Sequence, residues 1–456
     1  MHIQVNLNCL FIVNKDGLFF LTPYANQENM NSLPLTIPIL NELRKHYKAV
    51  RDQTLTLCAP LKTEDFVVQP IEDVSPPKWH LGHTTWFFEN FVLKPFKNDY
   101  TLFSEDYSFV FNSYYESVGS RVIRTNRGNL TRPSVDEIFQ YRSYVDAALV
   151  EFLEEDITEK TREIIILGLQ HEQQHQELLI YDIKYILGNN PLFPSYHPVG
   201  VNFTEIKSNT GYLDEQFISI EEGIYEIGQD GSEFCFDNEM GKHKVFLHAF
   251  QVQNRLITNG EYLAFMEAGG YEKFQYWLSD GWEWVKSNCI KAPLYWHQVD
   301  NEWQYYTLEG IKKINLSAPV SHISFYEADA FANWKGKRLL TEFEWEVACK
   351  ILSPSISKEA NFMEQGFFEP VVQQLGNLQF YGDAWEWTSS AYRPYPFFKT
   401  AEGALGEYNG KFMINQMVLR GGSCATPRDH IRPTYRNFFQ PHLRWQITGL
   451  RLAQNI

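Results

Sequence analysis

Apolar residues recur at helical spacing from Pro34 to about Asn190. In this part of the chain the pattern predicts four helices, over residues 38–57, 78–93, 133–154 and 158–188. Residues 95–132, between the second and third of these helices, form a connection longer than compact domains usually contain, and such connections are commonly functional or disordered. The sequence therefore predicts a four-helix bundle with one long connection, in which metal sites form between facing helices.

After about residue 212 the pattern changes to short apolar runs separated by turn signals such as Asp230-Gly231, and Gly, Trp and Tyr become more frequent. Two stretches there stand out as helical, 260–269 and 324–336. This pattern predicts a mixed α+β domain. We therefore expect a multidomain α and α+β protein with an N-terminal extension (1–33), a helical bundle (34–195) and a second domain (212–456).

The composition narrows the class of protein. With 456 residues the chain is too long for one ordinary core, and its net charge of −16 disfavours nucleic acid and anionic membrane as partners. Its six cysteines are scattered without a C-x-x-C pair, which is typical of reduced thiols in the cytosol. No apolar run approaches the roughly 18 residues of a membrane span, and the first residues lack the basic region of a signal peptide. These features predict a cytoplasmic protein.

The helix predicted over 158–188 carries a polar patch within an apolar face. His171 and His175 are four residues apart, so they lie one turn apart on the same side of the helix. Two imidazoles at this spacing can bind one metal ion, although two satisfied histidines on a helix surface would show the same pattern. The residues that share this face are Leu167, His171, Gln174, His175, Leu178 and Asp182.

A third histidine ligand is available on the helix predicted over 78–93. His80 and His83, in the motif WHLGH, are three residues apart and cannot both face the bundle axis equally well. Periodicity does not choose between them. Three histidines on an octahedral metal would leave positions for substrate and oxygen, an arrangement that iron oxygenases use.

The connection 95–132 contains phenols and arginines. Tyr114 and Tyr115 are adjacent. Four arginines fall within twelve residues of this acidic protein, namely Arg121, Arg124, Arg127 and Arg132. Because the guanidinium group matches a carboxylate or a phosphate, the cluster predicts an anion-binding loop. A solvated surface loop is the alternative.

Five motifs follow one another along the chain: WHLGH, HEQQHQELL, GDAWEWTSS, RGGSCAT and RPTYRNFFQP. In this order the chain resembles the sulfoxide synthases of ergothioneine biosynthesis, over roughly residues 35–456. The resemblance implies a DinB-like four-helix bundle joined to a domain of the formylglycine-generating-enzyme type, which has a C-type-lectin-like fold. It also implies an iron(II) ion held by His83, His171 and His175, which selects His83 over His80.

The resemblance implies a reaction as well. The family couples a thiol to C2 of the imidazole of hercynine (Nα-trimethylhistidine) and oxidises the sulfur with O2. The pairs Tyr114-Tyr115 and Phe438-Phe439 resemble the branch that uses cysteine, whose product is hercynylcysteine sulfoxide. On this resemblance Tyr114 and Tyr115 supply the proton donor, a role that suits a neutral phenol. Tyr395 is a further candidate phenol.

Substrate contacts follow from the same resemblance. Arg124 and Arg127 would hold the carboxylate of cysteine, and Asp73 would hold its ammonium group. Aromatic faces suit the quaternary ammonium group of hercynine through cation–π attraction. The residues implied to line the hercynine pocket are Gln174, Asn437, Phe438 and Phe439.

Alternatives to this interpretation are open. γ-Glutamylcysteine or a selenosugar could replace cysteine as the donor. The sequence HEQQH also matches the H-E-x-x-H signature of zinc metalloproteases, with Glu172 as the base, but the metzincin continuation H-x-x-G-x-x-H is absent. A formylglycine-generating enzyme would need a pair of cysteines near the C-terminal end, and Cys424 stands alone there.

Overall fold

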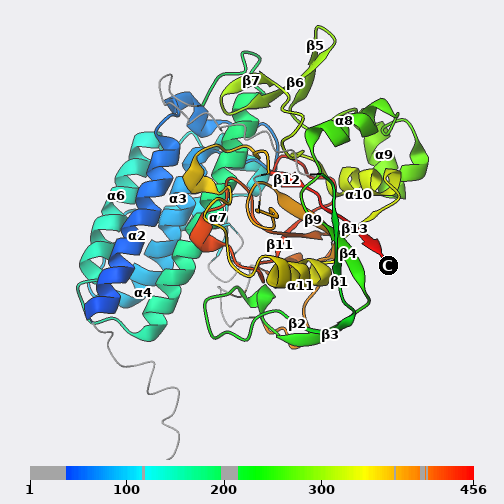
Figure 1. Cartoon of the computed structure of the whole chain (residues 1–456). Helices are drawn as coiled ribbons and strands as arrows, with labels where there is room; N and C mark the ends of the chain where they lie inside the picture. The colour runs from blue at the N-terminus through cyan, green and yellow to red at the C-terminus, as the bar shows by residue number, and fades with distance from the viewer. Residues whose placement is uncertain are drawn as a thin grey trace, which may run out of the picture.

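The computed structural model describes residues 37–113, 115, 119–196, 214–373, 376–400, 406 and 409–456. The predicted extension 1–33 and the candidate phenol Tyr114 lie outside the described residues. The described chain forms a helical bundle packed beside a domain of small sheets and short helices (Figure 1). Of the helices in the described ranges, none combines the length and the apolar character that crossing a membrane requires.

Four long helices form the bundle, as the apolar period predicts. They are α2 (Ile37–Cys58), α3 (Pro77–Phe88), α6 (Val135–Phe152) and α7 (Glu159–Gly188). A π-helical turn, η2 (Glu89–Leu93), carries α3 on into α4 (Lys94–Phe96). The loops contain η1 (Thr63–Val67), α5 (Tyr107–Phe111) and η4 (Arg124–Asn129).

Side chains at the helix ends explain where α6 and α7 begin. Ser134 and Glu137 form a capping box at the start of α6. The hydroxyl of Thr158 caps α7 by accepting a hydrogen bond from the N–H of Thr161 at 3.3 Å. Asp156 and Glu159 have the spacing of a capping box, but they do not form one, because Thr158 directly precedes the first helical residue and occupies the cap position.

The second domain is built from four small sheets. Their strand orders are β1-β4-β13-β8, β11-β10-β9-β12, β2-β3 and β5-β6-β7, and all pairs are antiparallel except β12 with β9. The strands are β1 (Phe217–Ile220), β2 (Gly223–Ile227), β3 (His243–Leu247), β4 (Phe250–Gln253), β5 (Trp296–Val299), β6 (Glu302–Thr307), β7 (Gly310–Lys313), β8 (Arg338–Leu339), β9 (Trp385–Ala391), β10 (Met417–Arg420), β11 (Asn437–Phe439), β12 (Thr448–Gly449) and β13 (Leu452–Asn455).

Four short helices accompany these sheets. They are α8 (Asn259–Glu267), α9 (Ser279–Ser287), α10 (Phe325–Trp334) and α11 (Glu342–Leu352). The sequence predicts α8 and α10 but neither α9 nor α11. Single turns of 3-10 helix lie between them and the strands: η5 (Asp237–Glu239), η6 (Phe274–Tyr276), η7 (Met363–Gln365), η9 (Gly410–Phe412) and η10 (Arg428–His430).

Helix α7 packs against α3 within the bundle and against the second domain. In Figure 1 it lies between the other bundle helices and the second domain. Toward α3 it carries Gly168, where a Cβ atom would lie 2.6 Å from the ring of Phe88, so the missing side chain lets the two helices approach. Toward the second domain it carries Glu177, whose Oε1 accepts hydrogen bonds from the indole of Trp385 at 2.5 Å and the hydroxyl of Ser423 at 2.9 Å. The position of α7 is therefore fixed from both sides.

A buried ion cluster stabilises the bundle on the side of α7 that faces α2 and α6. The Glu172 carboxylate accepts hydrogen bonds from Arg51 Nη1 at 2.8 Å, from Arg142 Nη2 at 2.6 Å and from the hydroxyl of Thr54 at 2.6 Å. Burial alone would raise the pKa of Glu172, but Arg142 and Arg51 outweigh it and lower that pKa to about 2. Glu172 is therefore a charged structural residue.

The substitution Glu172→Gln should destabilise the protein by about 3–5 kcal/mol, because it leaves the buried guanidinium of Arg142 without its anion and that of Arg51 with Asp146 alone. Since the folded-state pKa lies below the ordinary value of 4.5, this stabilisation is present above about pH 4.5 and is lost as the pH falls toward 2. Urea unfolding at pH 7 measures the loss. The exposed Glu163 on the same helix offers the matched control, and Glu163→Gln should stay within about 0.5 kcal/mol of wild type. Equal unfolding midpoints for the two variants would contradict a structural role for Glu172.

Candidate functional site

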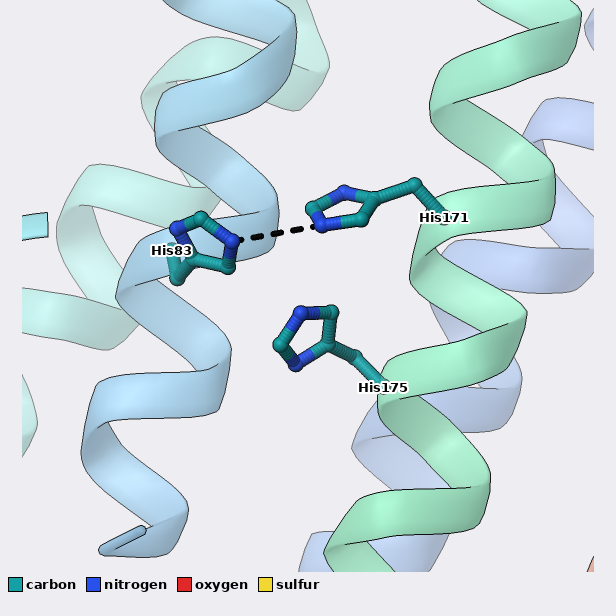
Figure 2. A group of neighbouring side chains, drawn as sticks. All are labelled: His83, His171 and His175. Atoms are coloured by element: carbon teal, nitrogen blue, oxygen red, sulfur yellow. Dashed lines mark hydrogen bonds between the residues drawn. The ribbon is translucent and has the colours of Figure 1, made fainter. Parts of the chain in front are cut away.

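Three histidines from two facing helices converge at one point. Figure 2 shows His83 on α3 pointing toward His171 and His175 on α7. One ring nitrogen from each lies within 4.8 Å of the others, and no other described group of three His, Cys, Asp or Glu residues gathers in this way. His83 Nε2 and His171 Nε2 are 3.2 Å apart. The structure therefore brings together the three residues that the sequence motifs suggest.

Hydrogen bonding fixes which nitrogen of His83 carries its proton. His83 Nδ1 lies 2.7 Å from the carbonyl oxygen of Phe111, which can only accept, so Nδ1–H donates and the Nε2 lone pair faces the triad. Gly82 makes this contact possible, because a Cβ atom there would lie 2.2 Å from the Phe111 ring. The indole of Trp79 stacks on the His83 imidazole at a centroid distance of 4.5 Å and holds its plane.

A second chain of hydrogen bonds orients His175. Asp182 Oδ2 accepts from His80 Nε2 at 2.9 Å and from the backbone N–H of Ser75 at 2.9 Å. His80 Nδ1 lies 2.8 Å from His175 Nδ1, so this hydrogen bond engages Nδ1 of His175 and leaves its Nε2 for a ligand. Asp182 Oδ1 accepts from the indole of Trp445 in the second domain at 2.9 Å. His80 thus lies outside the triad and orients one of its members.

The charge state of the triad fits a metal ion. Burial lowers the pKa of His83, His171 and His175, and that of His171 falls to about 4, so all three are neutral at pH 7. One ring nitrogen of each converges on the same point without an acidic partner in the group, and the buried His171 Nδ1 has no hydrogen-bond partner among the described residues. Three neutral imidazoles form a donor set that suits a divalent transition metal.

A pocket opens beside the triad. Eleven of the twelve residues proposed for the site on sequence grounds line it: Asp73, His83, Tyr115, Arg124, Arg127, His171, Gln174, His175, Asn437, Phe438 and Phe439. The twelfth, Tyr114, lies outside the described residues.

The candidate phenol Tyr395 does not line this pocket. Its hydroxyl donates to Glu342 Oε2 at 3.0 Å and accepts from Arg420 Nη2 at 2.8 Å within the core of the second domain. Tyr115, in contrast, is buried against Trp86 and Phe91 at the pocket wall. The sequence alone could not place Tyr395, because its hydroxyl contacts Glu342 and Arg420, which lie far from it along the chain.

Two arginines of η4 form one wall of the pocket. Arg127 is buried with its guanidinium 3.3 Å from the centroid of the Trp79 ring, and it donates to the hydroxyls of Ser75 at 2.9 Å and Ser113 at 3.0 Å. Arg124 donates to the backbone carbonyl of Asp73 at 2.6 Å. Burial raises the pKa of the Asp73 carboxyl, although Arg124 opposes this effect. Of the four arginines in the sequence cluster, Arg121 and Arg132 do not line the pocket.

Strand β11 forms an aromatic part of the pocket wall. Phe438 stacks on Tyr392 at a centroid distance of 4.1 Å and an interplanar angle of 11°, and Phe439 meets the edge of Trp445 at 5.2 Å. Pairing of β11 with β10 fixes this wall, since Phe438 lies opposite Val418 in the ladder. The adjacent Tyr435 also lines the pocket, and sequence reasoning missed it.

Glu172 lies on another face of α7. It contacts Arg51, Arg142 and Thr54 in the bundle core and does not line the pocket. A zinc metalloprotease of the H-E-x-x-H type needs this glutamate beside the metal as its base. The geometry therefore argues against the protease interpretation.

Comparisons with known proteins agree with the two-part architecture. Residues 202–456 match the family model described as sulfatase-modifying factor enzyme 1-like domain, and residues 46–179 match the model of the DinB superfamily. The hercynine oxygenase of Mycolicibacterium smegmatis is 26% identical over 410 residues, which cover 84% of this chain and 92% of that protein. The hercynine oxygenase of Mycolicibacterium thermoresistibile is 28% identical over 319 residues, covering 63% of this chain and 68% of that protein.

A eukaryotic protein is similar as well. Ergothioneine biosynthesis protein 1 of Schizosaccharomyces pombe is 25% identical over 419 residues, covering 83% of this chain and 52% of that protein. Similarity to these oxygenases identifies the chain as an enzyme of the oxidoreductase class. The chain belongs to the family of proteins with a sulfatase-modifying factor enzyme 1-like domain, which here follows a DinB superfamily domain.

Proposed function

We propose that this enzyme is an iron(II)- and O2-dependent sulfoxide synthase of ergothioneine biosynthesis, which joins the sulfur of cysteine to C2 of the hercynine imidazole. The observation that carries the proposal is the convergence of three neutral histidines at one wall of a pocket whose other walls carry arginines and aromatic rings. Relatives named hercynine oxygenase and ergothioneine biosynthesis protein 1 support the same pathway.

His83, His171 and His175 would hold the iron through their ring nitrogens. When bound, iron(II) would supply redox chemistry with O2 and positions for the sulfur and for an imidazole nitrogen. Zinc would fit three imidazoles equally well, but it has no redox chemistry. The oxygenase names of the relatives favour iron over zinc.

The overall reaction balances without a further reductant. Cysteine thiol, the C2–H of hercynine and O2 give hercynylcysteine sulfoxide and water. Forming the carbon–sulfur bond removes two electrons and oxidising the sulfur removes two more, which together reduce O2 fully. Tyr115, and Tyr114 beside it in sequence, would donate a proton in this process, since a phenol is neutral at pH 7. The burial of Tyr115 at the pocket wall supports this role.

The charges of the pocket suit a free amino acid as the thiol donor. Arg124 and Arg127 would hold the cysteine carboxylate, because both guanidinium groups lie at the same wall. Asp73, bound to Arg124 through its backbone, would hold the ammonium group. Asn437, Phe438 and Phe439 would surround hercynine with Gln174, and the aromatic faces would attract its quaternary ammonium.

The substitution His171→Ala should abolish stable iron binding, because two imidazoles remain on a site built for three. We expect affinity to fall by more than the roughly 10–100-fold that loss of an outer hydrogen-bond partner costs. Anaerobic titration with Fe(II), followed by metal analysis after gel filtration, measures the bound iron. His248, whose side chain is 87% exposed, provides the control: His248→Ala should retain about one iron per chain. Undiminished binding in His171→Ala would contradict the assignment.

The substitution Arg124→Ala should raise the KM for cysteine by about tenfold to a hundredfold, since a lost charge-assisted hydrogen bond costs roughly 1.5–3 kcal/mol. The KM for hercynine should change little, because Arg124 belongs to η4 and not to β11, whose residues would surround hercynine. Steady-state O2 consumption measures both constants. Arg132→Ala, an exposed member of the same cluster, should leave both unchanged. Equal increases for the two substrates would count against a carboxylate clamp.

The donor itself can be tested by O2 consumption with hercynine and each of three candidates, cysteine, γ-glutamylcysteine and a selenosugar. The amino-acid-sized charge pattern of Asp73, Arg124 and Arg127 predicts the highest kcat/KM with cysteine. Mass analysis of the product should give hercynylcysteine sulfoxide. A preference for γ-glutamylcysteine would overturn the donor assignment but keep the pathway, whereas a preference for the selenosugar would overturn both. No O2 consumption with any donor would overturn the function.

A further inference from the structure

A chain of hydrogen bonds ties the pocket residue Gln174 to the second domain. Gln174 Nε2 lies 2.7 Å from the hydroxyl of Tyr435, and that hydroxyl lies 3.0 Å from His430 Nε2. His430 Nδ1 lies 2.7 Å from Gln170 Oε1. Because Gln170 and Gln174 are four residues apart, His430 and Tyr435 bridge two successive turns of α7.

The direction of these hydrogen bonds, from donor to acceptor, follows from the contact between Gln170 and His430. Gln170 Oε1 is a carbonyl oxygen and only accepts, so His430 Nδ1 carries the proton. Burial lowers the pKa of His430 to about 3, with a contribution from Arg432, and the ring is therefore neutral at pH 7. A neutral ring protonated at Nδ1 has its lone pair at Nε2, which accepts from the Tyr435 hydroxyl.

The Tyr435 hydroxyl in turn orients the side chain of Gln174 in the pocket. Since the Tyr435 proton is directed to His430, the phenol oxygen is oriented to accept, and Gln174 Nε2 donates to it. The ring of Tyr435 is held edge-on by Phe236 at 5.7 Å and tilted against Trp385 at 5.4 Å, so the hydroxyl keeps its place. Gln174 lines the pocket on the face of α7 that carries His171 and His175, with its amide nitrogen bound to Tyr435.

We propose that His430 and Tyr435 fix Gln174 as a hydrogen-bond acceptor, so that the pocket selects a ligand that presents an N–H group at this point. The inference rests on the proposed function: in an imidazole bound to the ion through one nitrogen, the other nitrogen carries N–H. A carboxylate, which only accepts, is disfavoured opposite Gln174 Oε1. His430 and Tyr435 are thus positioning residues that set substrate orientation through Gln174.

The test compares imidazole with 1-methylimidazole as ligands of the full chain loaded with Co(II). Both can bind a metal through one ring nitrogen, but only imidazole retains an N–H group. The wild-type protein should bind imidazole roughly tenfold more tightly, because leaving the half-buried acceptor of Gln174 unpaired is costly. In Tyr435→Phe the ratio of the two dissociation constants should fall toward one, since Gln174 is no longer held. Ligand-field spectra report both constants without turnover.

Control variants distinguish the effect of the hydrogen bond to Gln174 from a steric effect of the methyl group. Tyr305→Phe also removes a hydroxyl of the second domain, one that donates to Glu369 at 2.9 Å away from the pocket, and it should keep the wild-type ratio. His430→Phe should lose discrimination as Tyr435→Phe does, which gives a second variant if one misfolds. A ratio that persists in both variants would mean that the methyl group clashes with the pocket wall, and it would overturn the inference.

The remaining outcomes distinguish the inference from the function on which it rests. Equal binding of the two ligands to the wild-type protein would overturn the acceptor role of Gln174 while leaving the metal site intact. Absence of any imidazole binding to the loaded protein would overturn both.

Discussion

The structure depends on keeping three imidazoles neutral with one ring nitrogen of each directed at one point. Burial removes the proton that a solvated histidine would partly carry near neutral pH. The Phe111 carbonyl then selects the tautomer of His83, and His80 with Asp182 orients the ring of His175. Phe111 lies in the long connection, His80 and Asp182 lie in the bundle, and Asp182 also accepts from Trp445 of the second domain, so all three parts contribute to the site.

Helix α7 carries a structural charge on one face and the residues of the site on another. Glu172 follows His171 directly, yet its carboxylate points into the bundle, where Arg51 and Arg142 neutralise it. Gln174 and His175 point into the pocket. The bundle would thus supply the metal ligands and, through η4, the arginines, whereas the second domain supplies the aromatic wall and the hydrogen bonds that orient α7 residues. This division explains why the site lies where the two parts meet.

The sequence was most informative where a regular period operates. Long helices such as α7 follow from apolar spacing, and the pair His171 and His175 follows from the same spacing. His80 and His83 are only three residues apart, so periodicity does not choose between them. The family resemblance selects His83. In the structure His80 is joined to His175 of the triad by a hydrogen bond.

Irregular segments gave weaker signals. Tyr435 lies in a stretch without a helical or strand period, so its position depends on contacts with residues far away in sequence. The sequence offers Tyr395 as a candidate phenol for the site, but its contacts with Glu342 and Arg420 depend on the tertiary structure and could not be predicted. Asp182 was visible on the histidine face of α7, whereas its three hydrogen-bond donors come from three separate segments.

X-ray absorption spectroscopy of the iron-loaded protein under anaerobic conditions tests the central claim most directly. The account predicts that iron is bound by three imidazoles of the protein, that hercynine adds a further imidazole nitrogen, and that cysteine adds one sulfur scatterer. Spectra of His171→Ala should lack this set. Iron bound mainly by carboxylates, or spectra unchanged by both substrates, would contradict the account.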